Sequence, residues 1–190
     1  SCQANCPSGV KIMDIFLKAR SIVSGYLGLS PVKKIIFRGL LTRPRLFNAL
    51  LDISGKFQGL FLRKADEVVG TSCAPLLNPF IGDRHFPKLA SEAFHSKTPT
   101  LNTETGQSGL RVAFFPGCVS DKIFPQIAEA TVKALQKNEV GIFMPEAQSC
   151  CGIPALASGD RKAYDSLVRQ NLSLFKSGDF DYLVTPCATC

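Results

Sequence analysis

Residues 110–118 read LRVAFFPGC, a short β-branched and aromatic stretch that leads into a proline, a glycine and a cysteine. Two later stretches repeat this arrangement, VGIFMPEAQSCC at 140–151 and YLVTPCATC at 182–190. Short apolar stretches bounded by turn residues predict strands, and the spacing of apolar residues between them predicts helices over 121–137 and 161–176. This alternation of strands and helices is typical of a small parallel sheet in an α/β domain.

A group of cysteines directly follows the three predicted strands. Its members are Cys118, Cys150, Cys151, Cys187 and Cys190. Because the carboxyl ends of parallel strands meet at one edge of a sheet, we expect these five thiols to converge there. Thiolates are the soft ligands that iron–sulfur clusters and zinc both favour, and the glycines and prolines beside them suit tight turns near a metal. The sequence therefore predicts one metal-binding set, for either a cluster or a structural zinc ion.

The adjacent pair Cys150-Cys151 is unusual for a metal site. Neighbouring side chains rarely reach two irons of a compact cube without strain. Five thiols that include such a pair indicate either an irregular cluster or one cysteine that does not bind the metal. A spare thiol would be available for disulfide chemistry.

Composition excludes several classes of protein. The chain has 190 residues, 45% of them hydrophobic, which suits one domain with a smaller appendage. Eight clustered cysteines without a secretory signal indicate metal or redox chemistry rather than a disulfide scaffold. No stretch approaches the ~18 apolar residues of a spanning helix, so the sequence predicts a cytoplasmic protein. It contains no nucleic-acid-binding module, P-loop or dinucleotide motif, and we assign no catalytic residue.

The first 108 residues differ in character from the remainder. Apolar spacing predicts a helix from Ile12 to about Gly25, and further helices from Pro31 onward with a break at Pro44. No strand is expected before residue 65. The segment that follows is rich in proline and polar residues, as surface linkers are. We therefore divide the chain into a helical segment at 1–65, a linker region at 66–108 and a cysteine-rich domain at 109–190.

The formal net charge of +7 comes from the first 70 residues, because the remainder is balanced. A basic stretch stands out there: Lys33, Lys34, Arg38, Arg43 and Arg45. Such residues usually form the solvated face of packed helices, and the alternative is docking onto an anionic membrane surface or an acidic partner.

Three further residues carry side chains of interest outside these patterns. Cys73 has no cysteine neighbour in the sequence and is expected to be an idle thiol. His85 and His95 are expected to be surface or capping residues rather than ligands.

The segments FFPGC, CCGIPALASGD and TPCATC resemble the cysteine-rich "CCG" domain over residues 110–190. That domain is shared by the heterodisulfide reductase B subunit, the iron–sulfur subunits of glycolate oxidase and D-lactate dehydrogenase, the anaerobic glycerol-3-phosphate dehydrogenase C subunit and a lactate-utilisation protein. The resemblance implies a [4Fe–4S] cluster at the five-cysteine set, noncubane in form if the adjacent pair takes part, with zinc as the alternative. Members usually carry two copies, so this is expected to be a truncated first copy.

The opening SCQANCPSGV resembles the close of the bacterial ferredoxin motif C-x2-C-x2-C-x3-C-P. In that motif the last cysteine serves the other cluster of a pair. The resemblance implies that Cys2 and Cys6 each belong to one of two ferredoxin-type [4Fe–4S] clusters. Their other ligands would precede Ser1, so we expect this sequence to be an excerpt of a longer protein.

The order of ferredoxin module, basic helical segment and CCG domain is similar to that of the glycolate and lactate oxidase iron–sulfur subunits. The resemblance implies a subunit of an oxidoreductase complex that has no substrate-oxidising site of its own. It would relay electrons from a flavin-containing dehydrogenase subunit, which oxidises a 2-hydroxy acid, to a quinone or another carrier. Peripheral association with a membrane or a quinone-reducing partner would place it at the inner face of the cytoplasmic membrane. The alternatives are disulfide reduction at the cluster, as in heterodisulfide reductase, and a structural zinc module.

Overall fold

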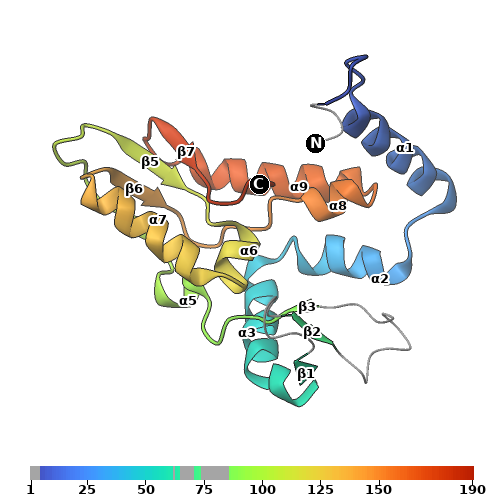
Figure 1. The fold of residues 1–190 in the computed structure, drawn as a ribbon, viewed down its shortest axis with the longest axis horizontal. Coiled ribbons are helices and arrows are strands. Elements are labelled where there is room, and N and C mark those ends of the chain that lie inside the picture. The colour runs from blue at the N-terminus through green and yellow to red at the C-terminus, as the bar shows by residue number, and fades with distance from the viewer. Residues whose placement is uncertain (1–4, 62, 65–70, 74–85) are drawn as a thin grey trace.

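A computed structural model describes residues 5–61, 63–64, 71–73 and 86–190 (Figure 1). Its C-terminal half is built on a four-stranded sheet in the order β4-β6-β5-β7. The strands are β4 (Leu101–Asn102), β5 (Arg111–Phe114), β6 (Gly141–Met144) and β7 (Tyr182–Val184). Strands β6 and β7 both run parallel to β5, whereas β4 runs antiparallel to β6.

The prediction of an α/β domain is confirmed, but the sheet is mixed rather than wholly parallel. The antiparallel strand β4 lies inside the region that the sequence assigned to a linker. It has only two residues, which is too short for an alternating pattern to be visible in the sequence.

Helices cover both faces of the sheet (Figure 1). On one face, α7 (Pro125–Lys137) and α5 (Phe94–Lys97) pack through Phe94, Ala128 and Val132 against Phe114 and Ile142 of the strands. On the other face, α9 (Arg161–Phe175) brings Phe175 against Ala113 and Phe115. Successive residues of β5 therefore contribute to opposite cores, as the two-residue period of a strand requires.

The helix predicted over 121–137 is two helices. The first, α6 (Gly117–Lys122), begins in the cysteine loop, and α7 begins at Pro125. Proline has no N–H to donate to the preceding turn but is well suited to the first position of a new helix, so the chain breaks there. The second predicted helix is confirmed as α9, where Asp160 accepts a hydrogen bond from the N–H of Ala163 at the helix start.

The first third of the chain is mainly helical, as expected. It contains α1 (Ile12–Leu27), α2 (Pro31–Lys34), a π-helix η1 (Ile35–Leu40) and α3 (Pro44–Phe61), so the break predicted at Pro44 is confirmed. Helix α1 continues past Gly25 and ends before Gly28, which has a positive φ of 72°. Among the described residues, no helix is long and apolar enough to span a membrane.

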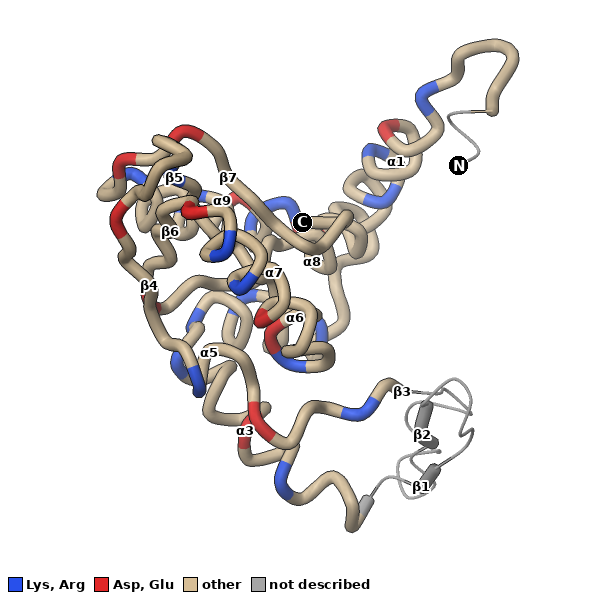
Figure 2. The backbone as a smooth tube through the Cα atoms, turned by 60° about the vertical axis from the view of Figure 1, so that its left-hand side comes forward, with Lys and Arg blue, Asp and Glu red and all other residues tan. Residues whose placement is uncertain are grey.

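The expectation that no strand precedes residue 65 is wrong. A second, three-stranded antiparallel sheet joins β1 (Arg63–Lys64), β2 (Thr71–Cys73) and β3 (Phe86–Pro87). Two of these strands have two residues each, so they are defined by pairing with one another rather than by local periodicity. Figure 2 shows charges of both signs around the larger sheet and along α1, whose acidic residue is Asp14 in the first turn.

Candidate metal centre

The topology of the larger sheet brings the cysteine loops together. The chain passes from β5 to its neighbour β6 and later returns across β5 to β7 on its other side. The loops that leave the carboxyl ends of these three parallel strands therefore meet at a topological switch point, where open α/β sheets commonly bind ligands. All five predicted cysteines lie in or directly after these loops.

In the loop after β5, Gly117 lets the backbone lie close to the thiol of Cys190. Gly117 has a positive φ of 70°, and a Cβ atom at this position would lie 2.9 Å from Cys190 Sγ. A side chain here would therefore occupy the space of the thiol, and glycine also tolerates the backbone conformation. Cys118 follows in the first turn of α6.

The loop after β6 is held by one buried amide side chain. The Oδ1 atom of Asn171, on α9, accepts hydrogen bonds from the N–H and the hydroxyl of Ser149 at 2.9 and 3.0 Å. Its Nδ2 atom donates to the carbonyl of Cys150 at 3.1 Å. Asn171 is buried and pairs with both a backbone N–H and a backbone carbonyl of the loop. It therefore fixes the position of the backbone at Cys150.

The five thiols form a continuous line of contacts. Cys118 Sγ lies 4.0 Å from Cys150 Sγ. The thiol of Cys151 interacts with those of Cys150 and Cys190, and Cys190 interacts in turn with Cys187. Of the described residues, no group of three or more His, Cys, Asp or Glu side chains has the arrangement that holds a metal ion.

These contacts change the acidity of the thiols. Contact with Cys150 lowers the pKa of Cys118, and contact with Cys190 lowers the pKa of Cys187. Contact with Cys118 raises the pKa of Cys150 to about 11. Contact with Cys150 raises the pKa of Cys151, and burial raises that of Cys190. Since neighbouring thiolates repel one another, a bound cation is needed to keep several of them deprotonated together.

The helical segment covers these loops. Phe37 and Leu41, from η1 and the residue after it, form one apolar cluster with Cys150, Ala155 and Leu167. Phe47, Cys118 and Cys151 pack against the same cluster. Cys150 is only 4% exposed as a result. The first third of the chain thus excludes water from one side of the cysteine set.

An ion pair attaches this covering segment. Arg38 donates from Nε to Asp160 Oδ2 at 2.8 Å and from Nη2 to Oδ1 at 3.1 Å. The Asp160 side chain is 1% exposed, whereas that of Arg38 is 46% exposed. Two further bonds reinforce the contact, from Arg20 Nη1 to the carbonyl of Ala157 and from Ser24 Oγ to that of Gly159. Arg38, read in the sequence as part of a solvated or docking face, binds within the chain.

A cavity of about 120 Å³ opens beside Cys118 and Cys150. Phe47 and Phe115 form apolar parts of its wall, and His95 reaches it from α5. The cavity therefore borders two of the five cysteines, and the helical segment covers one of these, Cys150.

The remaining sequence predictions have mixed outcomes. Cys6 is half-buried and is not part of the line of thiol contacts described above. Cys2 and His85 lie outside the described residues, and Cys73 is placed in β2 by its backbone alone. The side chain of His95 is partly exposed, and it lies in a network with Asp52, Asp121 and Lys122.

Three residues that position the site were not predicted from the sequence: Asn171, Arg38 and Asp160. Asn171 carried a visible signal, because Ala163, Leu167 and Asn171 follow one another at four-residue intervals along the buried face of α9. An amide in such a stripe needs a buried partner. The pairing of Arg38 with Asp160 carried no local signal.

Comparison with known proteins agrees with this geometry. Residues 112–190 match the family model described as "Cysteine-rich domain" (CCG). The chain is 27% identical over its whole length to the probable glycolate oxidase iron-sulfur subunit of Bacillus subtilis, of which it covers 44%. Over 42% of the chain it is 34% identical to lactate utilization protein A of an Exiguobacterium species, covering 32% of that protein.

A further relative is one of the subunits of the fumarate reductase (CoM/CoB) of Methanothermobacter marburgensis. It is 29% identical over half of this chain, which covers 22% of it. No solved structure matches. The chain thus spans less than half the length of these relatives. The predicted resemblance to the CCG cysteine-rich domain is confirmed, because residues 112–190, which carry the three cysteine loops, match the model of that family.

Proposed function

We propose that this chain is an iron–sulfur electron-transfer subunit of an oxidoreductase complex, with the cluster bound by the five-cysteine set. The observation that carries the proposal is the convergence of Cys118, Cys150, Cys151, Cys187 and Cys190 at the switch point of the sheet. The donor set is entirely thiol, which fits soft iron–sulfur chemistry. When bound, a cluster supplies one-electron redox chemistry at this edge of the sheet.

The number of thiols supports a polynuclear centre rather than one zinc ion. The set has five thiols, whereas a structural zinc ion takes four ligands. The low exposure of Cys150 also suits a redox centre, because burial and hydrogen bonds to sulfur control its reduction potential.

The proposed electron donor is a flavin-containing subunit that oxidises a 2-hydroxy acid, and the proposed acceptor is a quinone or another carrier. The relatives named for glycolate oxidase and lactate utilisation support this assignment. Helix α1 supports assembly with a further protein surface, because none of its residues is buried and Phe16, Ile22 and Tyr26 are exposed. Exposed apolar patches of this kind commonly mark interaction sites.

Anaerobic reconstitution of the full-length protein tests the proposal. Iron and sulfide should bind and give a cluster signal by electron paramagnetic resonance (EPR), and Cys118→Ala should reduce both iron content and signal. The control is Cys73→Ala, which removes a thiol outside the set and should leave both unchanged. Parallel Cys150→Ala and Cys151→Ala variants identify which member of the pair binds iron. Stoichiometric zinc with no iron uptake would refute the cluster, and a disulfide that perturbs the EPR signal would favour direct disulfide reduction.

A further inference from the structure

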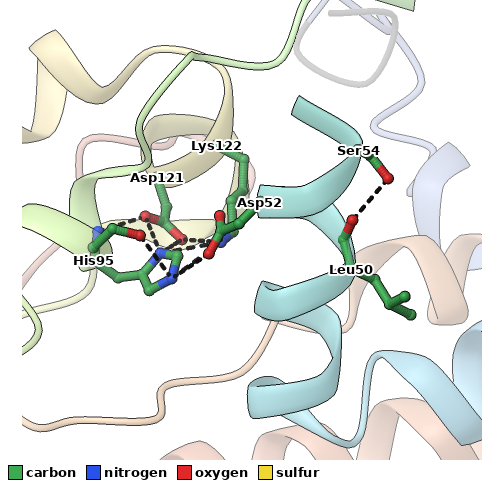
Figure 3. A network of polar contacts seen from close by, with 7 residues as sticks. Leu50, Asp52, Ser54, His95, Asp121 and Lys122 are labelled. Atoms are coloured by element: carbon green, nitrogen blue, oxygen red, sulfur yellow. Dashed lines mark hydrogen bonds and ion pairs between the residues drawn. The ribbon is translucent and has the colours of Figure 1, made fainter. Parts of the chain in front are cut away.

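A compact network of charged side chains joins Asp52, His95, Asp121 and Lys122 (Figure 3). His95 Nδ1 lies 3.0 Å from both carboxylate oxygens of Asp121, and Nε2 lies 3.3 Å from Asp52 Oδ2. The ammonium of Lys122 lies 3.2 Å from Asp52 Oδ1 and 3.0 Å from His95 Nδ1. Three helices meet here, because Asp52 comes from α3, His95 from α5, and Asp121 and Lys122 from α6.

The surroundings of His95 accommodate both protonation states of the imidazole. With a proton on Nδ1, the ring donates to Asp121. Without it, Nδ1 accepts from the Lys122 ammonium, which is within the same distance. Because Nδ1 faces both an acceptor and a donor, it keeps a hydrogen bond whether or not it carries a proton. Gain or loss of this proton therefore leaves no buried group unsatisfied.

Charged side chains surround the imidazole of His95. Two carboxylates surround one ammonium, so the group carries excess negative charge when the imidazole is neutral. Burial alone would raise the pKa of Asp121, but hydrogen bonds from His95 and the charge of Lys122 outweigh burial and lower it. Asp121 therefore stays ionised at neutral pH. Imidazole is the side chain that ordinarily exchanges a proton between about pH 5 and 8.

The network shares a cavity with two members of the cysteine set. His95 and Asp121 line the same cavity as Cys118 and Cys150. Asp121 also follows Cys118 by three residues on α6, which places them on one side of the helix. The His95 side chain is 27% exposed, so it can exchange protons with solvent. Other charged groups face this region from the neighbouring elements: Arg45 of α3 and Glu146 on the cavity, and the Lys97–Glu129 pair between α5 and α7.

We propose that His95 takes up a proton when the cysteine-bound centre is reduced, so that electron transfer at this site is coupled to protonation. One electron from the donor subunit enters the centre, and one proton from water binds His95 Nδ1. Reoxidation by the acceptor releases both. The added negative charge of the reduced centre favours the imidazolium, and Asp52 and Asp121 compensate its positive charge. This inference rests on the proposed function, because it requires a redox centre at the five-cysteine set.

The test is a redox titration of the reconstituted full-length protein, with dithionite as reductant, at several values from pH 5.5 to 8.5. The midpoint potential should fall with rising pH over part of this range, at a slope approaching one proton per electron. His95→Gln should abolish the slope while the cluster signal persists. His85→Gln, which replaces the other histidine of the chain, should retain it.

Each result bears on a different part of the inference. A cluster that forms but has a pH-independent potential overturns the role of His95 and leaves the electron-transfer function intact. If the midpoint potential of His95→Gln still falls with rising pH, the role of His95 is likewise overturned and the electron-transfer function stays intact. If His95→Gln does not fold, Asp52→Asn replaces it and should move the sloping region to lower pH, and an unmoved region counts against the proposal. No iron–sulfur signal at all overturns the proposed function, and this inference with it.

Discussion

Removing the Arg38 side chain should detach the helical segment that covers the cysteine set. Arg38→Ala leaves the carboxylate of Asp160 with only the N–H of Ala163 as a hydrogen-bond donor among the contacts described. Removing one partner of a fully buried ion pair costs about 3–5 kcal/mol. Arg38 is 46% exposed, so water can partly replace it, and we expect about 1–2 kcal/mol. This free energy would be lost from the contact between η1 and the CCG domain.

The weaker attachment of the covering segment in Arg38→Ala can be measured at Cys150. Phe37 and Leu41 shield this thiol, which becomes reactive only when the covering segment opens. A change of about 1–2 kcal/mol raises the open population roughly 5–30-fold. In the metal-free full-length protein, alkylation of Cys150 followed by mass spectrometry should accelerate by that factor. Backbone hydrogen exchange over residues 35–40 should accelerate with it.

Matched variants distinguish the ion pair from general damage. Arg43→Ala removes an exposed cation from the same basic stretch and should change neither rate. Asp160→Asn keeps an acceptor for the N–H of Ala163 but removes the charge, and combined with Arg38→Ala it should cost less than the two changes added. The reasoning fails if Arg38→Ala leaves Cys150 as unreactive as in the unchanged protein.

The same pair predicts how the covering depends on pH. Burial would raise the pKa of Asp160, but the hydrogen bonds from Arg38 and Ala163 and the charge of Arg38 outweigh it and lower this pKa. The unfolded chain therefore binds the proton more readily, and the contribution of Asp160 is complete above its unfolded pKa of about 3.9. It is lost as the pH falls through the lower folded value. In Arg38→Ala this pH dependence should become smaller or reverse, because burial still raises the pKa of Asp160 while the hydrogen bond and charge of Arg38 no longer lower it.

Two further substitutions test the loops themselves. Gly117→Ala should reduce iron uptake on reconstitution, because its Cβ would lie 2.9 Å from Cys190 Sγ, whereas Gly109→Ala has a similar φ of 65° but meets nothing within 4 Å. Equal iron uptake by the two variants would show that the space at Gly117 is not needed. Asn171→Leu should destabilise the domain by about 1–3 kcal/mol in thermal unfolding, because the N–H of Ser149 and the carbonyl of Cys150 lose their partner. The exposed neighbour Leu172→Ala should cost much less, and a comparable loss would contradict the role of Asn171.

Local pattern was enough to predict the strands β5, β6 and β7, the helix α9 and the position of each cysteine after a strand. These features depend on residues that are neighbours in the chain, where the period of two or 3.6 residues shows directly which face is buried. The short strands β1 and β4 escaped detection because two residues carry no period. The break between α6 and α7 was missed, although Pro125 signalled it.

The sequence by itself determined that five thiols follow three strands and that parallel pairing would gather them at one edge. Only the tertiary structure decided which thiols are neighbours, what covers them and which charges lie beside them. Arg38 and Asp160 are 122 positions apart, and Lys122 and Asp52 are 70 apart. Such pairs form because packing brings their helices together, and no local spacing encodes that distance. The chemistry of the donors is thus a property of the chain, whereas their burial and their charged surroundings are properties of the fold.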